Sequence, residues 1–229
     1  MNKKVHRKKR NWRNIISNIL FIILVMSIIF TIVRIVQAPS EAPVGSHEKV
    51  KSDYVLTLLQ CILGLIVMFI PTFVEHKWSI DIPNKMEIAY FIFLYCAIYL
   101  GEVHDFYYVI PHWDTILHAF SGATLGALGF FLVSYFNDAE ILDTNLSPFF
   151  IAFFAFCFAL AAGVVWEIYE FLADFILKTN MQKFILADGT VLQGQEALLD
   201  TMEDLIVDAI SAFTISAIGY FSIKRNREM

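Results

Sequence analysis

Six apolar segments, each about as long as a transmembrane helix, are separated by short polar stretches along the chain. They cover residues 15–36, 54–74, 86–107, 113–135, 148–175 and 203–223. An α-helix rises about 1.5 Å per residue and the hydrocarbon core of a bilayer is about 30 Å thick, so about 20 apolar residues cross it. The pattern predicts an all-α, polytopic membrane helix bundle with six transmembrane helices and one domain over residues 15–223.

Composition and charge support a membrane protein and suggest its orientation. The chain is 58% hydrophobic, with a mean hydropathy of +0.62, which argues against a soluble domain. The flanking segments 1–14 and 224–229 are basic, so the positive-inside rule predicts that both termini are cytoplasmic. Topology alone accounts for the basic tails, although the first could also bind anionic lipid. We therefore expect the lipid bilayer as a partner and no nucleic acid.

The segment WDTILHAFSGATLG, residues 113–126, places polar and small residues on one helical face. Asp114 and His118 are four residues apart, and Gly122 and Gly126 continue the same spacing. Small residues let a neighbouring helix approach closely in lipid. Ionisable residues inside an apolar span usually face the bundle interior and are functional candidates. The alternative is that Asp114 lies at the water interface and that His118 bonds a backbone carbonyl.

Carboxylates gather at the predicted outer ends of the last four spans. The residues concerned, with the histidine, are Glu102, Asp105, Asp114, His118, Glu167, Glu170, Asp174, Asp200, Asp204 and Asp208. The rise of a helix places them in one layer of the outer leaflet. Nearby cations such as Lys183 are predicted to sit in loops, so the carboxylates would lack Lys or Arg partners and would take up protons or a cation. The alternative is a solvated acidic rim.

We expect one cation-binding site in this layer. Its predicted ligands are His118, Glu167, Glu170, Asp200 and Asp204. Carboxylate and imidazole ligands suit a divalent metal such as Zn, Mn or Mg, with shared protons or a cationic group of a substrate as the alternatives. Glu167 or Glu170 would act as a catalytic base. The residues predicted to contact substrate or support the ligands are Glu102, Asp105, Asp114, Asp174, Gln193 and Asp208.

The loop before the last span contains a hairpin signal. An Asp188-Gly189 pair lies between apolar flanks, which favours a tight turn. We expect residues 184–192 to form a hairpin-like lid over the acidic layer.

Three motifs, in order, resemble the YjdF-like family of bacterial inner-membrane proteins. They are WDTILHAFSG (113–122), WEIYEF (166–171) and LQGQEALLDTMEDLIVDAISA (192–212), and the resemblance covers roughly residues 86–220. The positions that match the family pattern are Asp114, His118, Gly122, Glu167, Glu170, Gln193, Gly194, Asp200, Thr201 and Asp204. Phe171 departs from the usual Trp, and Ser211-Ala212 from the usual Gly-Ala. The resemblance, and a more distant one to VanZ-like proteins, implies a multi-pass protein of the bacterial cytoplasmic membrane with work at the cell envelope, but no reaction.

Three functions remain open from the sequence. The first is a metal-dependent enzyme acting on a lipid or lipid-linked envelope substrate. The second is a cation- or proton-coupled transporter, because intramembrane carboxylates are common in transporters. Against it, the inner halves of the spans around Gly126 and after Asp208 are apolar, and no inverted repeat is evident. The third is a non-catalytic membrane scaffold. The pattern does not decide whether the protein is an enzyme, or its oligomeric state.

Overall fold

The computed structural model describes residues 12–40, 49–138, 146–177, 179–186 and 189–228. Its helices are α1 (Trp12–Gln37), α2 (Lys51–Val67), α3 (Ile70–Trp78), α4 (Asn84–Leu94), the π-helix η1 (Tyr95–Val103), α5 (Phe106–Val109), α6 (Trp113–Asp138), α7 (Pro148–Leu177) and α8 (Gln195–Glu228). Among these residues, six helical segments are long and apolar enough to cross a membrane. The predicted all-α, six-span fold is therefore confirmed.

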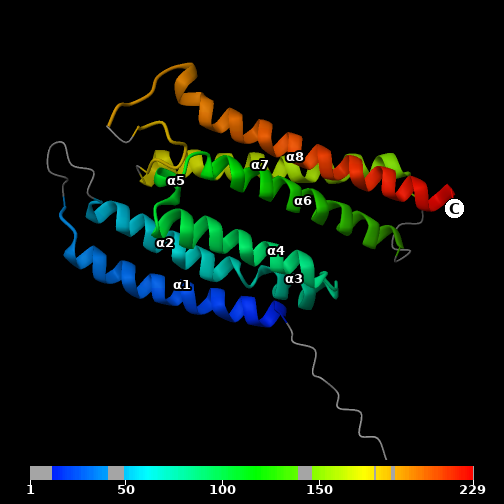
Figure 1. Cartoon of the computed structure of the whole chain (residues 1–229), viewed down its shortest axis with the longest axis horizontal. Coiled ribbons are helices and arrows are strands. Elements are labelled where there is room, and N and C mark those ends of the chain that lie inside the picture. The colour runs from blue at the N-terminus through cyan, green and yellow to red at the C-terminus, as the bar shows by residue number, and fades with distance from the viewer. Residues whose placement is uncertain (1–11, 41–48, 139–145, 178, 187–188, 229) are drawn as a thin grey trace, which may run out of the picture.

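The long helices run side by side in two layers (Figure 1). One layer contains α1, α2 and α4 with η1, and the other is a tightly packed group of α6, α7 and α8; the layers meet mainly through α4 and α6. The starts of α2, α6 and α8 lie at one end of the bundle, which we call the site end. The start of α1 and the end of α8 lie at the opposite end, as an even number of spans requires.

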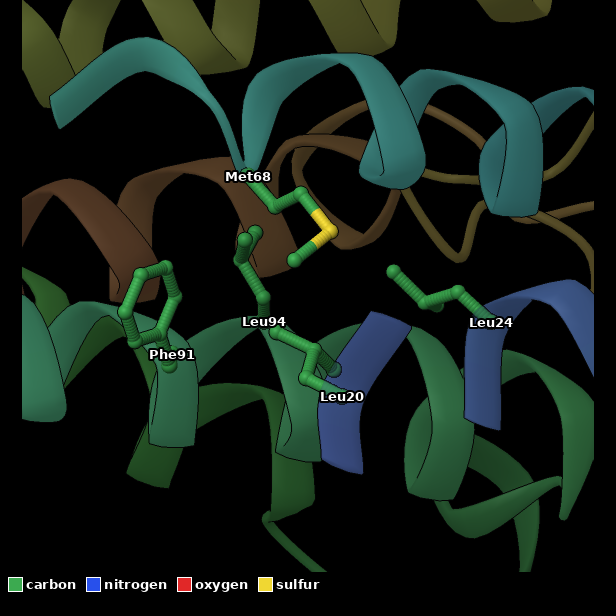
Figure 2. Packing of buried hydrophobic residues seen from close by; sticks show 5 residues of the cluster. All are labelled: Leu20, Leu24, Met68, Phe91 and Leu94. Carbon is green, nitrogen blue, oxygen red and sulfur yellow. The ribbon is translucent and has the colours of Figure 1, made fainter. Parts of the chain in front are cut away.

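Apolar side chains both fill the first layer and cover the outside of the bundle. Leu20, Leu24, Met68, Phe91 and Leu94 form a buried cluster between α1, the end of α2 and α4 (Figure 2). Many large apolar side chains point outward instead, among them Ile22, Phe153 and Phe213. Such a surface would be costly in water, whereas lipid chains solvate it well. The spans therefore imply contact with a bilayer.

Close packing of α6 against its neighbours depends on glycine, as predicted. A Cβ added at Gly122 would lie 2.3 Å from Ser211 Oγ and 3.0 Å from the carbonyl oxygen of Asp208. At Gly126 it would lie 3.5 Å from Ala212 Cα, which is ordinary van der Waals contact. The contact of α6 with α8 is therefore closer at Gly122 than at Gly126, one turn nearer the site end.

The second span is interrupted at Met68 and Phe69, just before Pro71 in the first turn of α3. Proline cannot donate to the carbonyl four residues earlier, which is that of Val67. The hydroxyl of Tyr90 donates to this Val67 oxygen at 2.8 Å, so the freed acceptor is satisfied by the neighbouring helix α4. The break divides the span into α2 and α3, and the carbonyl of Val67 keeps a hydrogen-bond partner.

The helix boundaries also differ from the apolar segments in the third and the last spans. The third span continues from α4 into a π-helix that ends at Val103, and Asp105, with φ 62°, separates it from the short α5. Helix α8 begins at Gln195, well before the apolar stretch that starts at 203, and runs on to Glu228. Hydropathy locates the apolar part of a helix, whereas backbone hydrogen bonding continues into the polar residues on either side. The first eleven residues of the predicted basic tail lie outside the described residues.

Candidate functional site

His118 lies at the centre of a group of buried carboxylates drawn from three helices. Its Nδ1 is 3.3 Å from Asp208 Oδ2. Its Nε2 is 3.7 Å from Glu167 Oε1, 3.8 Å from Asp204 Oδ2 and 3.9 Å from Asp114 Oδ1. All five side chains are buried except that of Asp114, which is 18% exposed. The acidic groups that the sequence places on separate helices thus meet around one imidazole.

Helical spacing and one glycine bring these groups together. Asp114 lies one turn before His118 on α6, and Asp204 lies one turn before Asp208 on α8. Gly163 on α7 faces Asp208: a Cβ there would lie 2.3 Å from Asp208 Oδ2. The absence of a side chain at Gly163 therefore leaves room for this carboxylate between α7 and α6.

The two sides of the imidazole have different environments. When Nδ1 carries a proton, it donates to Asp208, and Nε2 then presents its lone pair to the other three carboxylates. A metal-binding histidine commonly has this arrangement, with its second nitrogen bonded to an oxygen acceptor. Within the described chain, Asp204 Oδ2 and Asp208 Oδ1 are buried and accept no hydrogen bond. These oxygens have the capacity to bind a cation.

Asp114, His118 and Asp204 could hold a metal ion. Among the residues described, they form a group in which each offers one ligand atom and all these atoms lie within 4.8 Å of one another. Ligands held at 2.0–2.2 Å in a tetrahedral site are roughly 3.3–3.6 Å apart. The separations of 3.8 Å and 3.9 Å from His118 Nε2 would need to close by only a few tenths of an ångström. All three ligand atoms lie within 4.8 Å of one another, so the donor set could hold a divalent metal once its side chains move closer together.

A cavity of about 530 Å³ lies between the two helix layers and reaches this group. At the site end its wall includes Glu102, Asp114, His118, Glu170 and Lys183. Most of the remaining wall is apolar. Ligand sites commonly have this character, with a few polar groups converging at one part of an apolar pocket.

The prediction that the carboxylates lack a cationic partner is wrong, because Lys183 forms an ion pair with Asp114. It comes from the loop between α7 and α8, and its Nζ lies 3.4 Å from Asp114 Oδ2. The ammonium also donates to the carbonyl of Met181 at 2.9 Å and stands 4.8 Å from the ring centre of Tyr107. Burial by itself lowers the pKa of Lys183, but the nearby carboxylates, Asp114 foremost, outweigh it and raise the pKa above the ordinary value. The group is therefore a fixed positive charge.

Asp174 holds the loop that carries Lys183. Its carboxylate accepts a hydrogen bond from the Thr179 hydroxyl and two from the backbone amides of Met181 and Gln182, at 2.7 Å and 2.9 Å. The sequence predicts a substrate or ligand-supporting role for Asp174. In the structure it anchors the start of the loop, and so positions Lys183 rather than lining the cavity.

The same loop continues into a hairpin-like segment. Ile185 and Val191 form an antiparallel bridge, and the amide of Leu192 donates to the carbonyl of Phe184 at 2.8 Å. Gly189 has φ 85°, which suits glycine in a tight turn. The predicted hairpin shape is confirmed by these flanks, while residues 187–188 lie outside the described part of the chain. Its action as a lid stays a prediction.

The other predicted residues separate into those in the cavity wall and those outside it. Glu170 is in the wall, and its Oε1 accepts a hydrogen bond from Trp166 Nε1 at 3.0 Å. Glu167 contacts His118 but is not part of the wall. Asp200 lies one turn before Asp204, outside both the wall and the metal-capable group.

Two more predicted residues, Asp105 and Gln193, are not part of the cavity wall. Asp105 forms an ion pair with Lys49, and its side chain is 39% exposed. Gln193 is exposed. The structure therefore gives neither of them a contact with the cavity or with His118 among the residues that it describes.

Comparison with known proteins places the chain in a family. A protein of Thermotoga maritima, described only as an uncharacterized protein, is 31% identical over 159 residues, which is 66% of this chain and 70% of the relative. No solved structure matches significantly. The resemblance to YjdF-like and VanZ-like proteins stays a prediction. Residues 16–225 match the family described as "Predicted membrane protein (DUF2238)", and the chain therefore belongs to this family of membrane proteins.

Proposed function

We propose that this protein is a metal-dependent membrane enzyme acting on a lipid or lipid-linked substrate. The observation that carries the proposal is the position of Asp114 and His118. Both belong to the group that could hold a metal, and both are part of the wall of the largely apolar cavity. A metal held there would be accessible to the polar end of a molecule whose apolar part lies in the cavity.

The candidate ligands are Asp114, His118 and Asp204, with Glu167 close enough to His118 to join them. A divalent ion such as Zn, Mn or Mg in such a site polarises a phosphoryl or carbonyl oxygen and lowers the pKa of bound water. Asp208 would keep the imidazole oriented through Nδ1. The sequence predicts that Asp114 supports the ligands. In this proposal Asp114 is itself a ligand.

Glu170 is the better candidate for the general base. Its carboxylate is buried, lies in the cavity wall, and is oriented by the indole of Trp166. The reaction that fits best is hydrolysis of a phosphate ester. A water oxygen forms a bond to phosphorus, the bond from phosphorus to the leaving oxygen breaks, and Glu170 takes a proton from the water and returns it to the leaving oxygen.

The site would face outward from a bacterial cytoplasmic membrane. The basic tails support cytoplasmic termini, and the site end lies opposite the start of α1 and the end of α8. A lipid-linked substrate of the envelope would reach such a site from the outer leaflet.

The proposal is tested by turnover of phospholipids with defined headgroups. Purified protein in detergent is incubated with each lipid, with Mn²⁺ or Zn²⁺ or with EDTA, and the products are identified by mass spectrometry. We expect metal-dependent release of a headgroup or phosphate, and a loss of about two to four orders of magnitude in Glu170→Gln. Metal-dependent binding without any product, combined with metal uptake into liposomes, would contradict an enzyme and support a transporter.

A further inference from the structure

The cavity extends far beyond the polar group at the site end. Along α6 its wall runs from Asp114 to Leu132, which is a helical rise of roughly 27 Å. The hydrocarbon core of a bilayer is about 30 Å thick, so a wall of this length continues past the middle of the membrane. An active site that took only a headgroup would not need this length.

The wall between the two ends is mostly apolar and comes from both helix layers. Leu63 and Val67 of α2, Phe93 of α4, and Leu125 and Leu128 of α6 belong to it. A hydrated cation would lose its water there without gaining replacement ligands, which is strongly unfavourable. An aliphatic chain would gain contacts along the whole wall.

The far end of the cavity has a polar boundary. Glu87, whose side chain is fully buried, belongs to the wall there and forms an ion pair with Arg13, with Oε2 2.8 Å from Nε. Arg13 also lies 3.6 Å from Glu75. An apolar chain gains nothing by extending into a buried ion pair, so these residues would limit its length.

The volume of the cavity limits the number of chains. Its volume of about 530 Å³ lies within the roughly 300–1,000 Å³ of a site for one small-molecule ligand. One aliphatic chain of a membrane lipid is a ligand of this size, so we expect the cavity to take one chain.

We propose that the cavity binds a single-chain lipid that carries a phosphate, with its chain between the helix layers and its phosphate at Lys183 and the candidate metal. This inference rests on the proposed function for the headgroup, whereas the chain site rests on the cavity alone. Lys183 Nζ belongs to the same end of the cavity as His118 and would form an ion pair with the phosphate. Two sources have this chemistry: a lysophospholipid and a prenyl phosphate of similar length.

Photo-crosslinking on the full-length protein tests the position of the chain. The probe is lysophosphatidic acid with a diazirine at the end of its chain, added with Mn²⁺ or with EDTA. We expect crosslinks to map by mass spectrometry to the far part of the wall, at Met86, Tyr90 or Leu128. Crosslinks confined to outward-facing residues such as Phe153 would overturn the chain site.

Variants and competitors test the fit. Leu125→Trp places a larger ring in the cavity and should abolish the far-wall crosslinks, whereas the control Ile210→Trp, at an exposed position on α8, should keep them. Unlabelled lysophosphatidic acid or farnesyl phosphate should compete, and whichever does so at lower concentration identifies the source. Competition as strong from a diacyl phosphatidic acid would contradict a single-chain site, and stronger competition from a long-chain alkylamine would contradict the phosphate.

The two proposals fail in different ways. Far-wall crosslinks that are equal with Mn²⁺ and EDTA, and in Lys183→Met, would keep the chain site but remove the metal and Lys183 from headgroup binding. Tight metal binding and lipid turnover without far-wall crosslinks would keep the proposed enzyme and overturn the chain site.

Discussion

The carboxylate of Asp208 occupies the space that a side chain at Gly163 would fill. A Cβ on Gly163 would lie 2.3 Å from Asp208 Oδ2, the same oxygen that is 3.3 Å from His118 Nδ1. The glycine on α7 thus controls an interaction between α6 and α8. A methyl group at this position has to displace the carboxylate from the imidazole.

We therefore expect Gly163→Ala to weaken metal binding by about 10- to 100-fold, the range seen when a residue that orients a metal-binding histidine is lost. Titration calorimetry with Mn²⁺ or Zn²⁺ measures this. Gly126→Ala is the matched control, because its new Cβ would make ordinary contact at 3.5 Å with Ala212. Equal metal affinity in both variants would show that Asp208 does not orient His118.

The loop anchor at Asp174 gives a second prediction. Asp174→Ala removes the acceptor for the amides of Met181 and Gln182 and should destabilise the loop by about 1–3 kcal/mol. Amide hydrogen exchange should accelerate at these two residues, while α6 and α7 keep their protection. Gln193→Ala, at an exposed position of the same loop, is the control and should leave exchange unchanged. Unaltered exchange in Asp174→Ala would refute the anchor.

Lys183 should affect metal and phosphate in opposite directions. Its ammonium occupies a position 3.4 Å from Asp114 Oδ2 and so repels a cation at the same carboxylate. Lys183→Met should therefore tighten Mn²⁺ binding, by about tenfold for an interaction of about 1.4 kcal/mol, and weaken binding of a phosphate-bearing ligand. Lys183→Arg keeps the charge and should resemble the wild type. Weaker metal binding in Lys183→Met would contradict the competition.

Metal binding should also depend on pH in one direction. The candidate ligands Asp114, His118 and Asp204 bind a metal only when they are deprotonated, so protons compete with the ion. Stabilisation by metal should be largest at neutral to alkaline pH and should fall as the solution becomes acidic. Melting curves with and without Mn²⁺ across this range provide the measurement. A difference that grows toward acid pH would be incompatible with carboxylate and imidazole ligands.

The sequence predicts much of this arrangement because helical spacing is regular. The four-residue steps from Asp114 to His118 and from Asp204 to Asp208 follow from the chain alone, and the confirmed number of spans brings their helix ends together. Lys183 could not be predicted. Its position depends on a loop folded onto Asp174, and nothing in the local sequence indicates that the carboxylate accepts three hydrogen bonds there.

The cavity was beyond sequence reasoning for a related reason. It forms between two layers of helices, and apolar residues such as Leu63 and Leu125 have the same pattern whether they face lipid, a neighbouring helix or an internal space. The π-helix that carries Glu102 also escapes prediction, because its hydrogen bonding, for example from His104 N to Tyr99 O, changes the register of the wall without a proline or glycine signal at its start.

The central claim is that Asp114, His118 and Asp204 hold a divalent metal, and thermal stability with and without a chelator tests it most directly. Purified wild-type protein, His118→Ala and Asp204→Asn are melted in EDTA and in Mn²⁺ or Zn²⁺. A metal at about 100 times its dissociation constant should stabilise the wild type by roughly 2.7 kcal/mol, and the difference should vanish in both variants. A wild-type protein whose stability is the same in chelator and in metal would contradict the account.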